Sequence, residues 1–99
     1  MQEQSLRTGR FETPNAAKYV TQLCKHFGHK VPASIEGNRG QVTFAIGAAV
    51  MVADDAALTV TLSGSDAEAL AQMQQTIDDH LQRFAFREDF SGMTWGAAT

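Results

Sequence analysis

Two segments with helical periodicity enclose a long segment in which apolar residues alternate with polar ones. A three- and four-residue spacing, typical of an amphipathic helix, relates the apolar residues of the first segment: Ala16, Val20, Leu23 and Phe27. The same spacing relates those of the second: Leu70, Met73, Ile77, Leu81 and Phe84. Between them the period is two, which is typical of strands that bury one face. A sheet with helices on one face satisfies both patterns.

The helix boundaries are predicted from local signals. Thr-Pro at 13–14 is typical of an N-cap residue followed by the first helical position, and it predicts a helix over 14–28. Ser65 and Glu68 have the spacing of a capping box, which predicts a second helix over 66–86.

Turn residues divide the alternating segment into strands. We expect turns at 37–40, 47–48 and 54–55, a first strand over Leu6–Phe11, and a last strand within Phe90–Trp95. The apolar positions expected on one buried face are Val31, Ala33, Ile35, Val42, Phe44, Ile46, Val50, Val52, Leu58, Val60 and Leu62.

These elements predict an α+β fold in the order β-α-β-β-β-β-α-β. It would be an antiparallel sheet of five to six strands with two helices packed on one face. Ninety-nine residues are enough for a single domain, 1–99, and we expect its ordered core to cover about residues 5–95.

Composition excludes several function classes. The net charge of −3 argues against nucleic-acid binding, and the longest apolar run is too short to cross a membrane. One cysteine allows no internal disulfide, and with no secretory signal pattern it favours the cytoplasm. The charge is uneven, because residues 1–30 carry five basic and two acidic side chains. Such a positive region attracts a small anion or an acidic partner, although ordinary solvated surface explains it as well.

All three histidines are expected near the C-terminal ends of the helices: His26 and His29 at the end of the first, and His80 in the second. With Cys24 they have the residue types of a zinc or iron site. However, Cys24 and His26 are two residues apart, so they point in different directions on a regular helix. We therefore predict no metal site and no cofactor, and a buried structural Cys24.

A second pattern surrounds His80. Thr76, His80, Arg83 and Arg87 follow one another at four-, three- and four-residue spacing, and they share one flank if the helix continues to Arg87. One imidazole and two guanidinium groups suit a carboxylate or a phosphate. In the alternative, His80 bonds a backbone carbonyl and the arginines pair with neighbouring acidic residues.

The chain resembles the bacterial domain of unknown function 2218 family over roughly residues 7–95. The segments that carry the resemblance are Thr13–Ala16 with Tyr19, Leu23–Lys30, Asp66–Leu70 and His80–Glu88. Some members of that family occur near, or fused to, siderophore-interacting flavin reductases, so the resemblance implies a link to iron handling. It also implies that the helix-end histidines, here His26, His29 and His80, form a site.

We therefore expect a small cytoplasmic bacterial binding module that is not an enzyme and has no catalytic residues. Its predicted ligand-binding residues are His26, His29, His80, Arg83 and Arg87. The expected ligand is a small anion or an iron–siderophore complex, or the site contacts a partner protein. The alternative is a small enzyme or a metal-binding protein that uses the three histidines.

Overall fold

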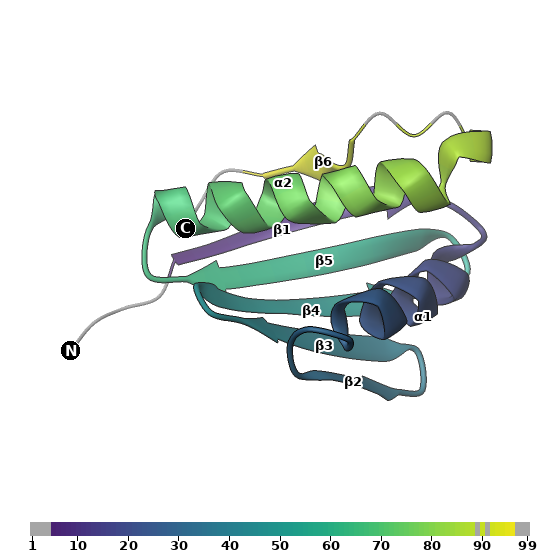
Figure 1. Ribbon diagram of the computed structural model, residues 1–99. Helices are drawn as coiled ribbons and strands as arrows, with labels where there is room; N and C mark the ends of the chain where they lie inside the picture. The colour runs from purple at the N-terminus through teal and green to yellow at the C-terminus, as the bar shows by residue number, and fades with distance from the viewer. Residues whose placement is uncertain (1–4, 89, 91, 97–99) are drawn as a thin grey trace.

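The computed structural model describes residues 5–88, 90 and 92–96. Six antiparallel strands form one sheet in the order β2-β3-β4-β5-β1-β6, and two helices lie on one of its faces (Figure 1). This arrangement confirms the predicted α+β fold and element order. The elements are β1 (Ser5–Glu12), α1 (Ala16–Phe27), β2 (Ala33–Glu36), β3 (Arg39–Phe44), β4 (Gly47–Ala53), β5 (Ala57–Gly64), α2 (Ala67–Phe84), the 3₁₀ turn η1 (Phe86–Glu88) and β6 (Thr94–Trp95).

Both helices present their apolar stripes to the sheet. α1 covers β2, β3 and β4, while α2 lies over β5, β1 and β4. The largest fully buried side chains come from both layers: Leu23, Met51, Leu58, Leu62, Leu70, Met73, Ile77 and Leu81. Cys24 belongs to this core, as predicted, and only glycine fits opposite it, because a Cβ on Gly40 would lie 2.6 Å from its Sγ.

The predicted cap of the first helix is wrong. α1 begins at Ala16 rather than at 14, and its N-cap is Asn15, whose side chain makes no capping hydrogen bond. The Thr13 hydroxyl is used elsewhere: its Oγ1 accepts from the Asn15 backbone N–H at 3.1 Å and donates to Glu88 Oε1 at 2.6 Å. Because the Thr13 hydroxyl bonds to Glu88, it does not cap a helix at residue 14, and α1 begins two residues later.

The predicted capping box of the second helix is also wrong, by one residue. The N-cap is Asp66, whose carboxylate accepts from the Ala69 backbone N–H at 2.8 Å. Ser65 therefore precedes the cap, and Glu68 lies in the first turn, where its charge suits the helix dipole. α2 ends at Phe84, two residues before the predicted end.

The turn between β3 and β4 corrects the predicted face of β4. The turn residues are 45–46, not 47–48, and Gly47 already belongs to the strand. A Cβ at Gly47 would collide with the Ser63 carbonyl oxygen of the neighbouring strand, so glycine is needed for close approach rather than for a turn. A shift of one residue moves a side chain to the opposite face, which places Val50 and Val52 outside. The buried residues of β4 are Ala49, Met51 and Ala53.

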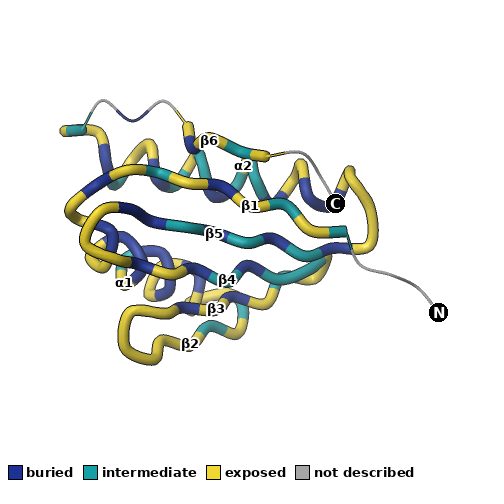
Figure 2. Tube along the Cα trace, turned by 180° about the vertical axis from the view of Figure 1, so that it is seen from behind, coloured by how far each residue is buried: buried dark blue, intermediate teal, exposed yellow. Residues whose placement is uncertain are grey.

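The second face of the sheet carries neither helix. Figure 2 shows it from behind, with the strands in front of both helices. Register and alternation place mainly polar and β-branched side chains on this face, among them Thr8, Arg39, Gln41, Val50, Val52, Thr59 and Thr61. No helix in the described part of the chain is long and apolar enough to cross a membrane.

The last strand is formed, and a half-buried carboxylate holds it. Trp95 pairs with Gly9 of β1, and its indole Nε1–H donates to Asp78 Oδ2 of α2 at 3.0 Å. The Met93 backbone N–H donates to Asp78 Oδ1 at 3.1 Å. Burial raises the pKa of the Asp78 carboxyl. α2 thus connects to the sheet edge through one side chain.

We predict that Gly9→Ala destabilises the protein by about 1–3 kcal/mol, the usual cost of overpacking. The added Cβ would lie 2.6–2.7 Å from three carbons of the Trp95 ring, and moving the ring would break its bond to Asp78. Urea denaturation measures the change. Gly96→Ala is the matched control, since its nearest neighbour would be at 3.7 Å. Equal stability of the two variants would contradict the packing of Trp95 on Gly9.

Candidate functional site

Two of the three predicted histidines meet between the helices. His26 is exposed in the last turn of α1, and His80 is half-buried in α2. Their Nε2 atoms are 3.0 Å apart, and their ring centroids are 4.5 Å apart. Residues 54 positions apart in the chain therefore come into direct contact.

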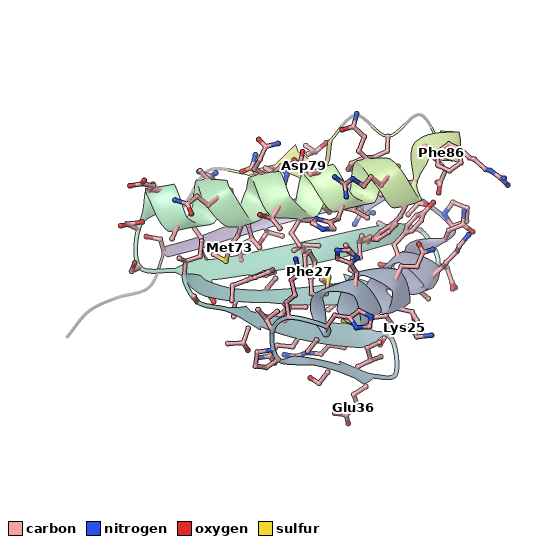
Figure 3. The ribbon with its side chains drawn as sticks, in the orientation of Figure 1. Lys25, Phe27, Glu36, Met73, Asp79 and Phe86 are labelled. Atoms are coloured by element: carbon pink, nitrogen blue, oxygen red, sulfur yellow. The ribbon has the colours of Figure 1, made fainter. Side chains whose placement is uncertain are left out.

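Aromatic rings pack against both imidazoles of the pair. Phe27, which Figure 3 shows between the two helices, has its ring centroid 4.7 Å from that of His80. Phe84 lies 6.0 Å from the His26 ring, and Phe44 of β3 lies 5.3 Å from Phe27. The imidazoles therefore rest on packed rings, and this packing restricts the orientation of His80 in particular.

The orientation of His80 determines its tautomer. Its Nδ1 lies 2.7 Å from the backbone carbonyl oxygen of Thr76, one helical turn earlier. A carbonyl only accepts, so Nδ1 carries a proton and donates it. In the neutral ring Nε2 is then an acceptor, and His26 Nε2–H is its donor. The backbone bond weighed as an alternative for His80 is present, yet it leaves Nε2 available to the site.

The neighbours of the pair are positively charged. Desolvation lowers the pKa of His26, and repulsion from His80, Lys30, His29 and Arg83 lowers it further. Every charged group that shifts the pKa of His26 is thus a basic side chain. Lys30 was not among the site residues predicted from the sequence; it lies in the turn after α1, four residues beyond His26.

The other predicted site residues lie at different distances from the pair. His29 is in the turn after α1, where its backbone N–H donates to the His26 carbonyl oxygen at 3.4 Å. Arg83 is exposed, one turn beyond His80. Arg87 does not continue the flank, because α2 ends at Phe84; it belongs to η1, with its guanidinium carbon 5.6 Å from the Phe86 ring centroid.

A carboxylate that sequence analysis did not select lies beside the start of α1. Glu88 Oε1 accepts from the Thr13 hydroxyl, and Oε2 accepts from Asn15 Nδ2 at 3.2 Å and from the Tyr19 hydroxyl. Burial and the bond to Glu88 raise the pKa of Tyr19 to about 12. Desolvation acts to raise the pKa of Glu88, but its three hydrogen bonds outweigh this and hold it below the ordinary value. The Glu88 cluster (Thr13, Asn15, Tyr19, Glu88) fastens η1 to α1.

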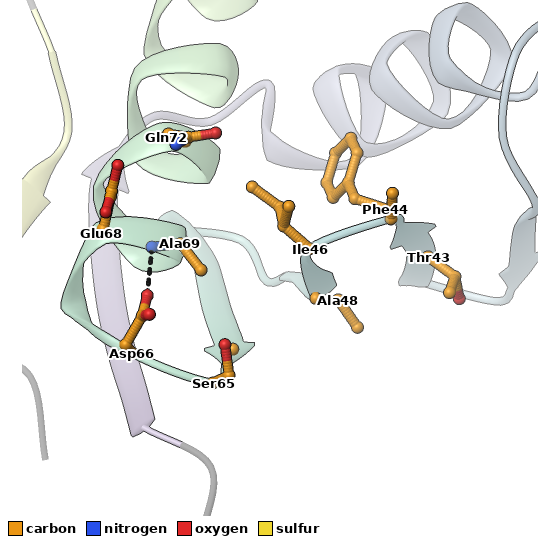
Figure 4. A pocket seen from close by; sticks show the side chains of 12 residues that line it. Thr43, Phe44, Ile46, Ala48, Ser65, Asp66, Glu68, Ala69 and Gln72 are labelled. Atoms are coloured by element: carbon orange, nitrogen blue, oxygen red, sulfur yellow. Dashed lines mark hydrogen bonds between the residues drawn. The ribbon is translucent and has the colours of Figure 1, made fainter.

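A hollow of about 650 Å³ lies at the opposite end of α2. One wall carries Phe44 and Ile46 of the β3–β4 hairpin, and the other carries Asp66, Glu68 and Gln72 (Figure 4). Its volume is in the range of ligand clefts, but its charges are acidic. These acidic side chains disfavour an anion in the hollow.

No three metal-ligating side chains converge in the described part of the chain. Cys24 is 4 % exposed, and its Sγ contacts the Ser34 carbonyl oxygen at 3.8 Å rather than an imidazole. Burial raises the pKa of the thiol, which removes the thiolate needed for ligation or attack. The side chains of Cys24 and His26 therefore point to different neighbours on α1, as predicted.

Residues 8–96 match the family described as an uncharacterized protein conserved in bacteria, DUF2218. The chain belongs to this family. This match confirms the resemblance drawn from the helix-end motifs. The NMR structure of PA4090 from Pseudomonas aeruginosa is similar, with 34% sequence identity and a TM-score of 0.78 over 92% of this chain and 94% of that one. A comparison with curated proteins found no match.

We predict that Glu88 makes stability depend on pH. Because its pKa is lower in the folded state, its contribution is present above the unfolded value of about 4.3 and is lost as pH falls through the folded value. Glu88→Gln should therefore cost about 1 kcal/mol at pH 7, a figure discounted for solvent access, and less at about pH 3.

Thermal unfolding of wild type and variant across this pH range measures the difference. The control Glu36→Gln removes a carboxylate from the outer face of the sheet and should change stability by less than about 0.5 kcal/mol. A Glu88→Gln penalty that is the same at both pH values would contradict the role given to the ionised carboxylate.

Proposed function

We propose that this DUF2218 domain is a non-catalytic binding module that holds a small anion, a carboxylate or a phosphate, where α1 and α2 meet. The observation that carries the proposal is the contact of His26 with His80, whose Nε2 atoms are 3.0 Å apart, among further basic groups. Desolvation and then repulsion from His80, Lys30, His29 and Arg83 lower the pKa of His26. Folding concentrates these groups at one place, and an anion relieves their mutual repulsion.

Each residue of the proposed site would contribute a different interaction with the anion. Arg83 supplies a planar guanidinium that can bind a carboxylate or phosphate through two hydrogen bonds, and Lys30 supplies a point charge. His26 supplies the ring Nε2–H group that otherwise donates to His80. Because Arg83 and Lys30 are exposed, the expected affinity is modest, about millimolar for a single small anion.

Two further observations favour binding over catalysis. The buried thiol of Cys24 contacts a carbonyl oxygen and has a raised pKa, which is unsuited to a nucleophile. The Glu88 carboxylate accepts three hydrogen bonds, so it is occupied in holding η1. An iron complex that presents carboxylates is a ligand of the same class, because its carboxylates bind Arg83 and Lys30 as a free carboxylate does.

The test is an NMR titration of metal-free protein with phosphate and with citrate. We expect saturable shifts at His26, His80 and Arg83, and a loss of affinity of about fivefold in Arg83→Gln and in Lys30→Gln, since each removes roughly 1 kcal/mol. Arg39→Gln is the control, because it removes the same charge from the outer face of the sheet. Shifts spread over other surfaces, or an equal effect of Arg39→Gln, would reject the site.

A further inference from the structure

The contact between His26 and His80 has the features of a pair of metal ligands. Histidines that bind metals through Nε2 usually donate their Nδ1–H to a carbonyl or carboxylate, which fixes the ring and directs the lone pair. His80 already makes this second bond, at 2.7 Å to the Thr76 carbonyl oxygen. Its Nε2 lone pair is thus directed towards His26 without a metal being present.

The separation of the two nitrogens fits a shared ion. Two imidazoles bound at about 2.0–2.1 Å to one metal lie about 2.8–3.0 Å apart at a right angle, and about 3.3–3.4 Å apart at a tetrahedral angle. The two Nε2 atoms are 3.0 Å apart. The ring centroids, at 4.5 Å, are closer than an end-to-end alignment of the rings would give, so the rings are inclined about the contact. For both Nε2 lone pairs to meet at one ion, the exposed His26 side chain must rotate and carry its proton on Nδ1 in place of Nε2.

We propose that His26 and His80 together bind one divalent late transition-metal ion, Cu²⁺, Ni²⁺ or Zn²⁺, which replaces the hydrogen bond between them and links α1 to α2. Imidazole is a preferred ligand for these ions. Since no three metal-ligating side chains converge among the described residues, the protein supplies two ligands. The remaining coordination positions are left to solvent or to a further ligand.

The charges around the pair indicate what that further ligand is. Arg83 and Lys30 repel a bare cation, but they attract an anion that a metal holds in front of them. The metal site therefore favours an ion that carries carboxylates or phosphate. This preference for an anionic complex rests on the proposed function, whereas the two-histidine site itself does not.

The probe is the nickel complex of nitrilotriacetate, which has one net negative charge and leaves two adjacent positions of its octahedron open. With tag-free, full-length protein we expect a one-to-one complex by calorimetry, with a Kd of about 10 µM, and paramagnetic broadening centred on His26 and His80. His26→Ala, an exposed position, should weaken binding at least about tenfold, and so should His80→Phe, which keeps a ring against Phe27. The control Arg39→Gln, on the outer face of the sheet, should keep the wild-type stoichiometry and change the Kd less than twofold.

The outcomes separate the two proposals. Binding of the nickel complex that needs both histidines supports the metal site even if free nitrilotriacetate and phosphate do not bind. Phosphate binding without any binding of the nickel complex overturns the metal site and leaves the proposed function standing. Weak nickel binding that survives in His80→Phe would show attachment to a single surface imidazole and would also overturn it.

Discussion

Burial of one face of a six-stranded sheet by only two helices is the constraint on which the rest of this structure depends. A helix is about 10 Å across, so both must lie side by side to cover the apolar positions of β3, β4 and β5. Leu23 of α1 and Ile77 of α2 are completely buried as a result. The same packing brings the end of α1 against the flank of α2, which is where His26 meets His80.

The polar bonds at the periphery depend on that packing and reinforce it. Asp78 lies on α2 above the edge of the sheet and accepts from Trp95 and from the Met93 backbone, so it positions a strand of only two residues. Glu88 connects η1 to the first turn of α1 through Thr13 and its neighbours. Both carboxylates accept hydrogen bonds on each of their two oxygens. This is the condition under which charge is tolerated beside an apolar core.

The histidine pair differs from these two structural carboxylates in its surroundings. Asp78 and Glu88 accept hydrogen bonds from neighbouring groups, whereas His26 lies among basic side chains. Repulsion within a folded surface is destabilising unless a ligand relieves it, so a cluster of this kind is more informative about binding than the acidic hollow at the other end of α2. The ring of Phe27 packs against His80 and restricts its orientation, so this half of the proposed site is preorganised.

The sequence by itself determined the fold class, the core stripes of both helices and the burial of Cys24, because periodicity and burial are local consequences of helix and strand geometry. It misplaced both helix caps, since Thr13 has a partner 75 residues away and Asp66 competes with its neighbour for the same backbone N–H groups. It also assigned Val50 and Val52 to the wrong face of the sheet, because Gly47 allows two strands to approach closely and is not a turn residue.

Only the tertiary structure decided which candidate residues meet. The helical spacing that joined Arg87 to His80 ended with α2 at Phe84, and Lys30 reached the site from the turn after α1. Distances between residues far apart in the chain depend on how two helices pack on a sheet, and no local pattern records that packing. The three histidines were therefore recognisable from the sequence as candidates, but the contact between His26 and His80 was not.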